Sequence, residues 1–283
     1  MSEFFANTRP GAEVTRGGVT FELPILYFRD DCFASFHTAD YHRVRALMPS
    51  DRLHPVRLPG GRTLVGVAAF NYIDTSIGPY GEVGVVVPAV HADRPPLPYL
   101  SGLLSGLLAG LLEARYPGFG NVVLHLPVTR TEARDAGRGE WGYTKFLADM
   151  RFANTPEHLE CGLSEGGRNI LTMRVIKRGM VSPDRKPLVT FSVRDGELIR
   201  TVIPQKGTVR NALWPLGSFL DLGDHEVAGA IRELDLSPQP FLTRYYVERS
   251  GILPSGKVVE RDVRPLEGFY GGEGDRDHVV TYT

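Results

Sequence analysis

The chain has 283 residues, of which 42% are hydrophobic and 23% charged, a balance that lets a globular protein bury a sizeable core. Its 32 basic and 33 acidic side chains give a net charge of -1 and are spread along the whole length, so neither nucleic acid nor a membrane surface is an expected partner. The 32 glycines and 21 prolines favour many turns and short strands over a helical bundle.

The N-terminal residues 1–18 read as an irregular arm, and no basic segment followed by an apolar run marks a signal peptide. The two cysteines, Cys32 and Cys161, form no CxxC pair, which favours free thiols in a reducing compartment. A cytoplasmic protein is therefore expected.

Alternating and β-branched runs predict strands along most of the chain. Asp195-Gly196 is a strong hairpin-turn signal between two of them. About eleven strands are more than one flat sheet holds comfortably, which favours an antiparallel barrel or two packed sheets. The predicted strands are Thr20–Tyr27, Phe33–His37, Thr63–Tyr72, Gly84–Val90, Val122–Val128, Phe146–Phe152, Ile170–Val175, Leu188–Val193, Leu198–Ile203, Thr208–Leu213 and Phe241–Val247.

Three helices are expected to pack on these strands. The first lies in Thr38–Pro49 with Thr38 as its N-cap, and the last lies in Asp224–Leu236. The middle one, Ser101–Tyr116, is rich in glycine and leucine. With no repeat and no linker in the sequence, we expect one mainly β (α+β) domain over residues 1–283.

The middle helix belongs to an uncharged segment that begins at Pro95 and carries Gly102, Gly106 and Gly110 on one helix face. A membrane-spanning helix needs roughly 20 apolar residues, and the apolar helix here is about 12 residues long. We therefore expect a buried helix, within the core or between subunits, rather than a membrane span.

Several common site motifs are absent. The sequence has no GxxxxGK[ST] and no GxGxxG after a predicted strand for nucleotides, and no HExxH or HxH for a metal. No cofactor and no metal are expected, and lysine and carboxylate chemistry remains. Lys145 differs from the other lysines because Trp141, Tyr143 and Phe146 surround it, although a lysine stem lying over surface aromatics would show the same pattern.

The segment around this lysine, GRGEWGYTKFLADM (Gly137–Met150), resembles the active-site segment of the acetoacetate decarboxylase family, approximately GREIWGFPKKLA. Upstream, LVGVAAFNYIDTSIGPYGE is similar to the family's LVRFEIMAMHDTSGLGCYTE, and FRDDCFASFHTADYHRVRALMP to its NREYFNIVYRTDMDALRKVVP. The three segments occur in the family's order and cover most of residues 20–150. The ungapped matches around the lysine are Gly137, Arg138, Trp141, Gly142, Lys145, Leu147 and Ala148.

The resemblance implies an acetoacetate decarboxylase-like β-barrel or double sheet, a homo-oligomer, and a lyase without a cofactor. In the family a lysine attacks the substrate ketone to form a Schiff base, whose protonated imine is the electron sink when the adjacent bond breaks. That lysine maps to Lys145, and one family glutamate maps to Glu82. The attacking amine must be neutral, whereas a free lysine has a pKa of about 10.4, and burial or a nearby cation can lower such a value.

The resemblance also marks residues expected to contact the substrate: Tyr80, Trp141, Tyr143, Phe146 and Arg29. Phe146 replaces the family's second lysine, and alternation along a strand favours its packing away from Lys145. Arg29 is one residue from the family's carboxylate-handling arginine, whose position holds Asp30.

Two more family carboxylates are displaced here. The second glutamate maps to Ala68, and the glutamate of GRE maps to Gly139, with Glu140 one residue on. A shift by one residue along a strand turns a side chain to the other face.

Three functions follow from these residues. The first is decarboxylation of a small β-keto acid through a Schiff base on Lys145. The second is aldolase or dehydratase chemistry on a 2-oxo acid with the same imine. The third is a non-catalytic barrel that binds a small ligand, which the missing charged residues would also fit.

Overall fold

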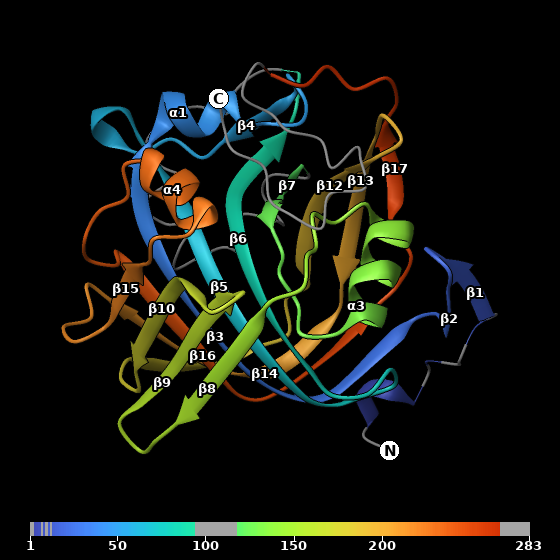
Figure 1. Ribbon diagram of the computed structural model, residues 1–283, viewed down its shortest axis with the longest axis horizontal. Helices are drawn as coiled ribbons and strands as arrows, with labels where there is room; N and C mark the ends of the chain where they lie inside the picture. The colour runs from blue at the N-terminus through green and yellow to red at the C-terminus, as the bar shows by residue number, and fades with distance from the viewer. Residues whose placement is uncertain (1–2, 7, 9–10, 12, 94–117, 267–283) are drawn as a thin grey trace.

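The computed structural model describes residues 3–6, 8, 11, 13–93 and 118–266, and it is built mainly of strands (Figure 1). The described helices are α1 (Tyr41–Ala46), α3 (Thr131–Ala136) and α4 (Glu226–Glu233), with the short helical turns η1 (Glu3–Phe5), η2 (Pro59–Gly61) and η3 (Gly137–Trp141). The strands are β1 (Glu13–Arg16), β2 (Val19–Glu22), β3 (Ile25–Asp40), β4 (Leu53–Pro55), β5 (Arg62–Thr75), β6 (Tyr80–His91), β7 (Phe119–His125), β8 (Asp149–Asn154), β9 (His158–Glu165), β10 (Arg168–Ile176), β11 (Met180–Asp184), β12 (Leu188–Arg194), β13 (Glu197–Ile203), β14 (Gln205–Leu213), β15 (Phe219–Leu222), β16 (Leu242–Leu253) and β17 (Lys257–Glu260).

One large sheet of 11 strands dominates the fold. Its order is β11-β14-β16-β3-β5-β6-β7-β12-β13-β17, with β4 paired to β6, and its pairs are antiparallel except β7 with β12. Within the described residues the end strands β11 and β17 do not pair with each other, so the sheet stays open. The prediction of a mainly β fold is confirmed, but a closed barrel is wrong; the double sheet is the alternative that fits.

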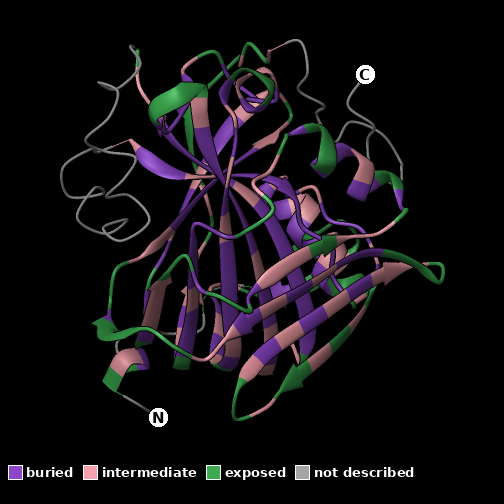
Figure 2. Cartoon of the chain, turned by 90° about the vertical axis from the view of Figure 1, so that its left-hand side faces the viewer, coloured by how far each residue is buried: buried purple, intermediate pink, exposed green. Residues whose placement is uncertain are grey.

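The second sheet has the order β15-β10-β9-β8 and packs across one face of the large sheet (Figure 1). Its apolar residues Leu163 and Met173 share a hydrophobic cluster with Val67 of β5 and Val85 of β6. These residues are almost completely buried. Figure 2 shows the buried residues running along the central strands, whereas the exposed residues gather on loops and hairpin ends.

Alternation along β5 and β6 gives the large sheet two apolar faces. Odd-numbered positions, such as Val67 and Val85, point into the core shared with the second sheet. Even-numbered positions, such as Ala68, Phe70 and Glu82, point to the opposite face, where they line a cavity. The same period that predicts these strands thus also places the cavity.

Element boundaries differ from the predictions for local reasons. Thr38 still belongs to β3, and Asp40 caps α1 because its carboxylate accepts the Arg43 N–H at 2.9 Å. The N-terminal arm contains the regular strand β1, paired with β2. The predicted strand Phe146–Phe152 begins only at Asp149.

One predicted helix cannot be compared with the structure, and several elements of the structure were not predicted. The helix predicted over Ser101–Tyr116, with its three-glycine face, lies outside the described residues. Strands β9, β11, β15 and β17 and helix α3 were not among the predicted elements. No helix in the described ranges has the length and apolar character to cross a membrane.

Candidate active site

Lys145 lies inside the cavity on the even-numbered face of the large sheet. Its side chain is only 6% exposed, and Nζ lies 2.5 Å from Oε2 of Glu82 on β6. Both residues line a cavity of about 210 Å³. The structure therefore brings together the two residues that the sequence predicts as catalytic, 63 positions apart along the chain.

Backbone hydrogen bonds hold the Lys145 segment beside β6. The N–H groups of Leu126 and Val128 donate to the carbonyls of Thr144 and Phe146 at 3.1 and 2.8 Å. Val128 in turn forms bridges to both Glu82 and Leu147. The chain after β7 is thus the connector that places the lysine segment against the strand that carries the glutamate.

Two motif glycines are required by this geometry. A Cβ on Gly137 would lie 2.5 Å from Cδ and Cε of Lys145, so the lysine stem occupies the space that any larger residue would need. Gly142 ends η3 with φ of 66°, where a non-glycine residue is strained, and a Cβ there would meet the Val193 carbonyl. The glycines of the motif therefore shape the turn and the channel through which Lys145 reaches the cavity.

Aromatic residues of the motif take three different places. Tyr143 lines the cavity, and its hydroxyl lies 2.7 Å from Oγ1 of Thr190. Trp141 stacks behind Tyr143, with ring centroids 6.1 Å apart, and donates its indole N–H to the Pro254 carbonyl. Trp141 therefore supports the cavity wall from behind rather than lining it.

Phe146 points away from Lys145, into the core between the two sheets. It is 2% exposed and belongs to the apolar cluster that includes β9 and β10. Extended residues on either side of Lys145 alternate in direction, which is the physical reason. The expectation that Phe146 contacts substrate is not met; it is a core residue.

A layer of tyrosines surrounds the ion pair. Tyr72 donates its hydroxyl to Oε1 of Glu82 at 3.2 Å, and the hydroxyls of Tyr27 and Tyr80 lie 2.9 Å apart. The centroid of the Tyr80 ring lies 5.7 Å from Nζ of Lys145. These rings contact each other, with centroids 4.4 Å apart for Tyr27–Tyr72 and 4.7 Å for Tyr72–Tyr80.

Burial keeps the tyrosines in their neutral form. Desolvation raises the pKa of Tyr72 and Tyr80 well above the ordinary value, and nearby Glu82 adds to the effect. Desolvation also raises the pKa of Tyr143 to about 12. At neutral pH the hydroxyl groups are therefore protonated, and that of Tyr72 donates its hydrogen bond to the carboxylate of Glu82.

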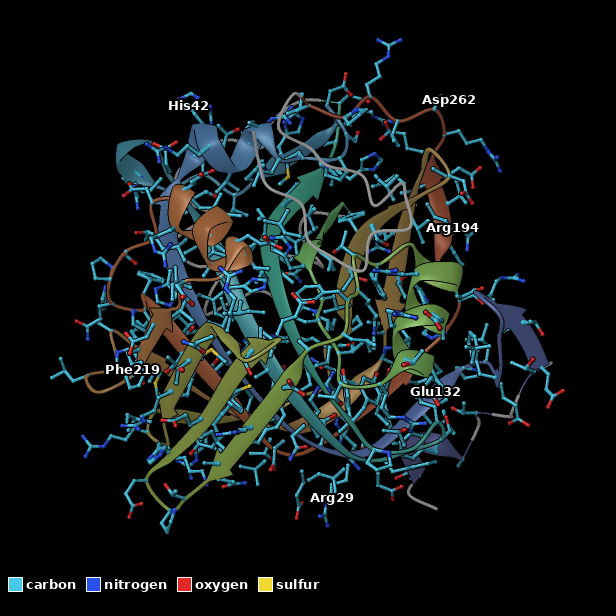
Figure 3. The ribbon with its side chains drawn as sticks, in the orientation of Figure 1. Arg29, His42, Glu132, Arg194, Phe219 and Asp262 are labelled. Atoms are coloured by element: carbon cyan, nitrogen blue, oxygen red, sulfur yellow. The ribbon has the colours of Figure 1, made fainter. Side chains whose placement is uncertain are left out.

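Arg29 does not reach the cavity. It is exposed, and Figure 3 shows it at the margin of the molecule. The pairing of β3 with β5 is irregular on either side of Arg29, but Asp30 stays in phase with Cys32 and points inward. The role of carboxylate ligand that the sequence assigned to Arg29 is therefore not supported by its position.

Another arginine, Arg249 of β16, occupies this part of the cavity wall. Its Nη1 lies 2.6 Å from Asp30 Oδ2, with the two side chains 3% and 0% exposed, and its Nε donates to Gln205 at 2.9 Å. β16 pairs with β3 so that Arg249 lies opposite Asp30. Sequence reasoning missed Arg249; the signal was Asp30 itself, since a buried carboxylate requires a partner.

Glu140 is also outside the cavity. It accepts a hydrogen bond from Nε of Arg16 in the N-terminal hairpin at 3.0 Å. The displaced motif carboxylate thus joins β1 to η3 instead of facing Lys145. Among the residues that the structure describes, no group of three His, Cys, Asp or Glu side chains could hold a metal ion.

Comparisons with known proteins identify the family and the fold of this chain. The family model described as acetoacetate decarboxylase (ADC) matches residues 13–263. A comparison with curated proteins finds no match.

Solved structures show the same fold at low sequence identity. An acetoacetate decarboxylase from Legionella pneumophila has a TM-score of 0.61 and 18% identity over 84% of this chain and 88% of that one. A second acetoacetate decarboxylase structure has a TM-score of 0.62 and 18% identity over 85% and 91%. The enduracididine biosynthesis enzyme MppR, complexed with a condensation product of pyruvate, has a TM-score of 0.59 and 13% identity over 84% and 90%.

With most of its length matched by the family model, and with this fold, the chain belongs to the acetoacetate decarboxylase family.

Proposed function

We propose that this protein is a lyase that decarboxylates a β-keto acid through a Schiff base on Lys145. The observation that carries the proposal is the buried contact between Nζ of Lys145 and Glu82 in a tyrosine-lined cavity. A lysine placed there cannot serve solubility, and burying its charge is costly unless it is paired or neutralised.

Glu82 supports the first step because it can accept a proton from Lys145. The transfer leaves a neutral amine and a neutral carboxylic acid, two forms that an apolar cavity tolerates better than two charges. Nζ then attacks the ketone carbon, the C–N bond forms, and the ketone oxygen leaves as water. The proton held by Glu82 goes to the imine nitrogen.

The protonated imine drives the second step. The bond between the substrate's α-carbon and its carboxylate breaks, CO2 leaves, and the electron pair moves into the enamine. Glu82, which is a carboxylate again at this stage and is hydrogen-bonded to Tyr72, takes up a proton from solvent and delivers it to the α-carbon. Water hydrolyses the resulting imine, which releases the ketone and restores the amine of Lys145.

The charges of the wall favour decarboxylation. The two buried cations Lys145 and Arg249 each already contact a carboxylate, Glu82 and Asp30. A keto acid whose carboxylate lies beside these two pairs, rather than beside Arg244, therefore adds a negative charge that neither pair compensates. Its loss as neutral CO2 relieves that cost, which is greater in a cavity of low dielectric constant.

Aldolase or dehydratase chemistry on a 2-oxo acid is the second candidate, because it uses the same imine. It requires a group that holds the retained carboxylate. Arg244 also lines the cavity, where its Nε donates to Asn211 at 2.9 Å, and it would be that group. The MppR complex with pyruvate is the observation on a similar fold that favours this candidate.

The test is CO2 release from acetoacetate and longer β-keto acids by the unaltered chain, by Lys145→Ala and by Lys257→Ala, a control for an exposed lysine. We expect release that Lys145→Ala abolishes and Lys257→Ala leaves intact. Consumption of pyruvate with an aldehyde, without CO2, would favour the second candidate. No turnover of any keto acid would favour a non-catalytic binding protein.

Two further predictions do not concern the activity and are tested separately. The homo-oligomer implied by the family resemblance is tested by light scattering of the purified chain. The cytoplasmic location is tested by cell fractionation.

A further inference from the structure

The cavity continues well beyond the amine, and its wall changes character there. Next to Glu82 on the even-numbered face of the sheet, three small residues lie side by side on β3, β5 and β6. Ala34 pairs with Ala68, and Ala68 pairs with Gly84, and all three line the cavity. Small side chains in adjacent strands leave space where larger ones would meet.

Past this row the described lining is mostly apolar, and its polar residue is Asn121 of β7, which pairs with Pro88. From Glu82 the inward positions of β6 are Gly84, Val86 and Pro88, and six residues of strand extend about 20 Å. The residues that β3, β5, β6 and β7 contribute to this lobe carry no charge, and the charged residues of the whole described lining are Glu82, Lys145, Asp184, Lys186, Arg244 and Arg249. Besides these strand positions, the lobe is lined by Phe36, Leu64, Phe119, Val123 and Leu126.

The apolar wall of the lobe favours an apolar ligand. Such a ligand would give the wall the dispersion contacts that a packed core makes. Polar or charged groups would lose their hydration there. The ligand that suits the lobe is therefore an apolar chain.

The position of Ala68 supports the same conclusion. The family resemblance expects the second glutamate at this position, and the structure has a methyl group in the middle of the small-residue row. A glutamate side chain at this position would fill the space above the small residues and place a negative charge there. Alanine opens a path from the Lys145 end of the cavity to the apolar lobe.

We propose that the substrate is a β-keto acid with an alkyl tail of several carbons, whose ketone meets Lys145 while the tail passes over Ala68 and Gly84 into the apolar lobe. This inference rests on the proposed function. Acetoacetate, with a single methyl beyond its ketone, would leave the lobe empty. Each buried methylene is worth about fourfold in affinity, so chain length should control specificity.

The kinetic test compares 3-oxooctanoate with acetoacetate by CO2 release. We expect kcat/KM to be at least about tenfold higher for 3-oxooctanoate, since it adds four methylenes that the lobe can bury. Ala68→Leu should reduce the ratio of kcat/KM for 3-oxooctanoate to kcat/KM for acetoacetate at least about tenfold. Ala153→Leu, the same change at an exposed position of β8, should leave the ratio unchanged. Equal kcat/KM for both acids, or an unchanged ratio in Ala68→Leu, would overturn the proposal.

A binding test separates the lobe from the chemistry. Lys145→Ala cannot form an imine, so calorimetry with 2-nonanone and 2-pentanone on this variant reports the cavity alone. We expect at least about tenfold tighter binding of 2-nonanone, at one molecule per chain, and loss of that difference when Ala68→Leu is added. Equal affinities would overturn the lobe assignment. Tighter 2-nonanone binding without turnover of any keto acid would instead refute the decarboxylase and keep the ligand class.

Discussion

Replacing Glu82 by glutamine tests the role of the buried pair with the smallest change of shape. Glutamine can still accept the hydrogen bond from Tyr72, but it cannot take a proton from the amine 2.5 Å away. A positioned acid–base group contributes about 10²- to 10⁴-fold to a proton-transfer step. We therefore expect CO2 release by Glu82→Gln to fall at least about 100-fold.

The same change should affect stability. If Lys145 keeps its charge when Glu82 is replaced, a buried ammonium is left without its carboxylate, which costs about 3–5 kcal/mol. For a chain of this size the melting temperature would fall by about 6 °C or more.

The assay measures the rate of CO2 release and the melting temperature of Glu82→Gln beside Glu157→Gln, a matched change of an exposed glutamate on the loop before β9. Glu157→Gln should behave like the unaltered chain in both. A Glu82→Gln rate within about threefold of the unaltered chain would refute the assignment of Glu82 as the proton acceptor.

Three other changes test the surroundings. Arg249→Met leaves Asp30 buried without its cation and should cost about 3–5 kcal/mol in urea unfolding, and adding Asp30→Asn should recover most of it; a single variant as stable as the unaltered chain would contradict the buried pair. Phe146→Lys, which restores the family's second lysine, should destabilise the chain by at least about 3 kcal/mol without raising activity, since Phe146 lies in the core; a stable and more active variant would contradict that placement. Burial lowers the pKa of His125 to about 4 from 6.5, so the unfolded chain binds a proton between these values that the folded chain does not. The contribution of His125 to the free energy of unfolding should therefore be constant above pH 6.5 and fall by about 3 kcal/mol as the pH drops to 4. Melting experiments at several pH values should show that His125→Gln lacks this contribution.

Much of the fold follows from the alternation of side chains. The period of two in β5 and β6 predicts both strands, and it also explains why Phe70 and Glu82 share one face. The pattern does not say whether the sheet closes, because closure depends on which edge strands meet. β11 and β17, the two edges of the large sheet, are short and were not predicted.

In the candidate site, too, residues within short sequence motifs could be predicted, whereas a residue placed by pairing between distant strands could not. Lys145 and Glu82 could be predicted because short motifs carry them, and Gly137 belongs to the motif because the lysine stem passes over it. Arg249 could not be predicted, since its place beside Asp30 depends on the register of β16 with β3, two strands far apart in the sequence. The inward position of Asp30 indicates that a cation should lie beside it, but pairing register across such distances leaves no local signal of which residue that cation is.

Trapping the imine tests the Schiff base on Lys145 most directly. The unaltered chain is incubated with a β-keto acid, reduced with borohydride, digested, and mapped by mass spectrometry, beside Lys145→Ala. We predict a stable mass gain on the peptide that contains Lys145 and none in the variant. A mass gain on another lysine that survives in Lys145→Ala, or CO2 release without any trapped adduct, would contradict the Schiff-base mechanism.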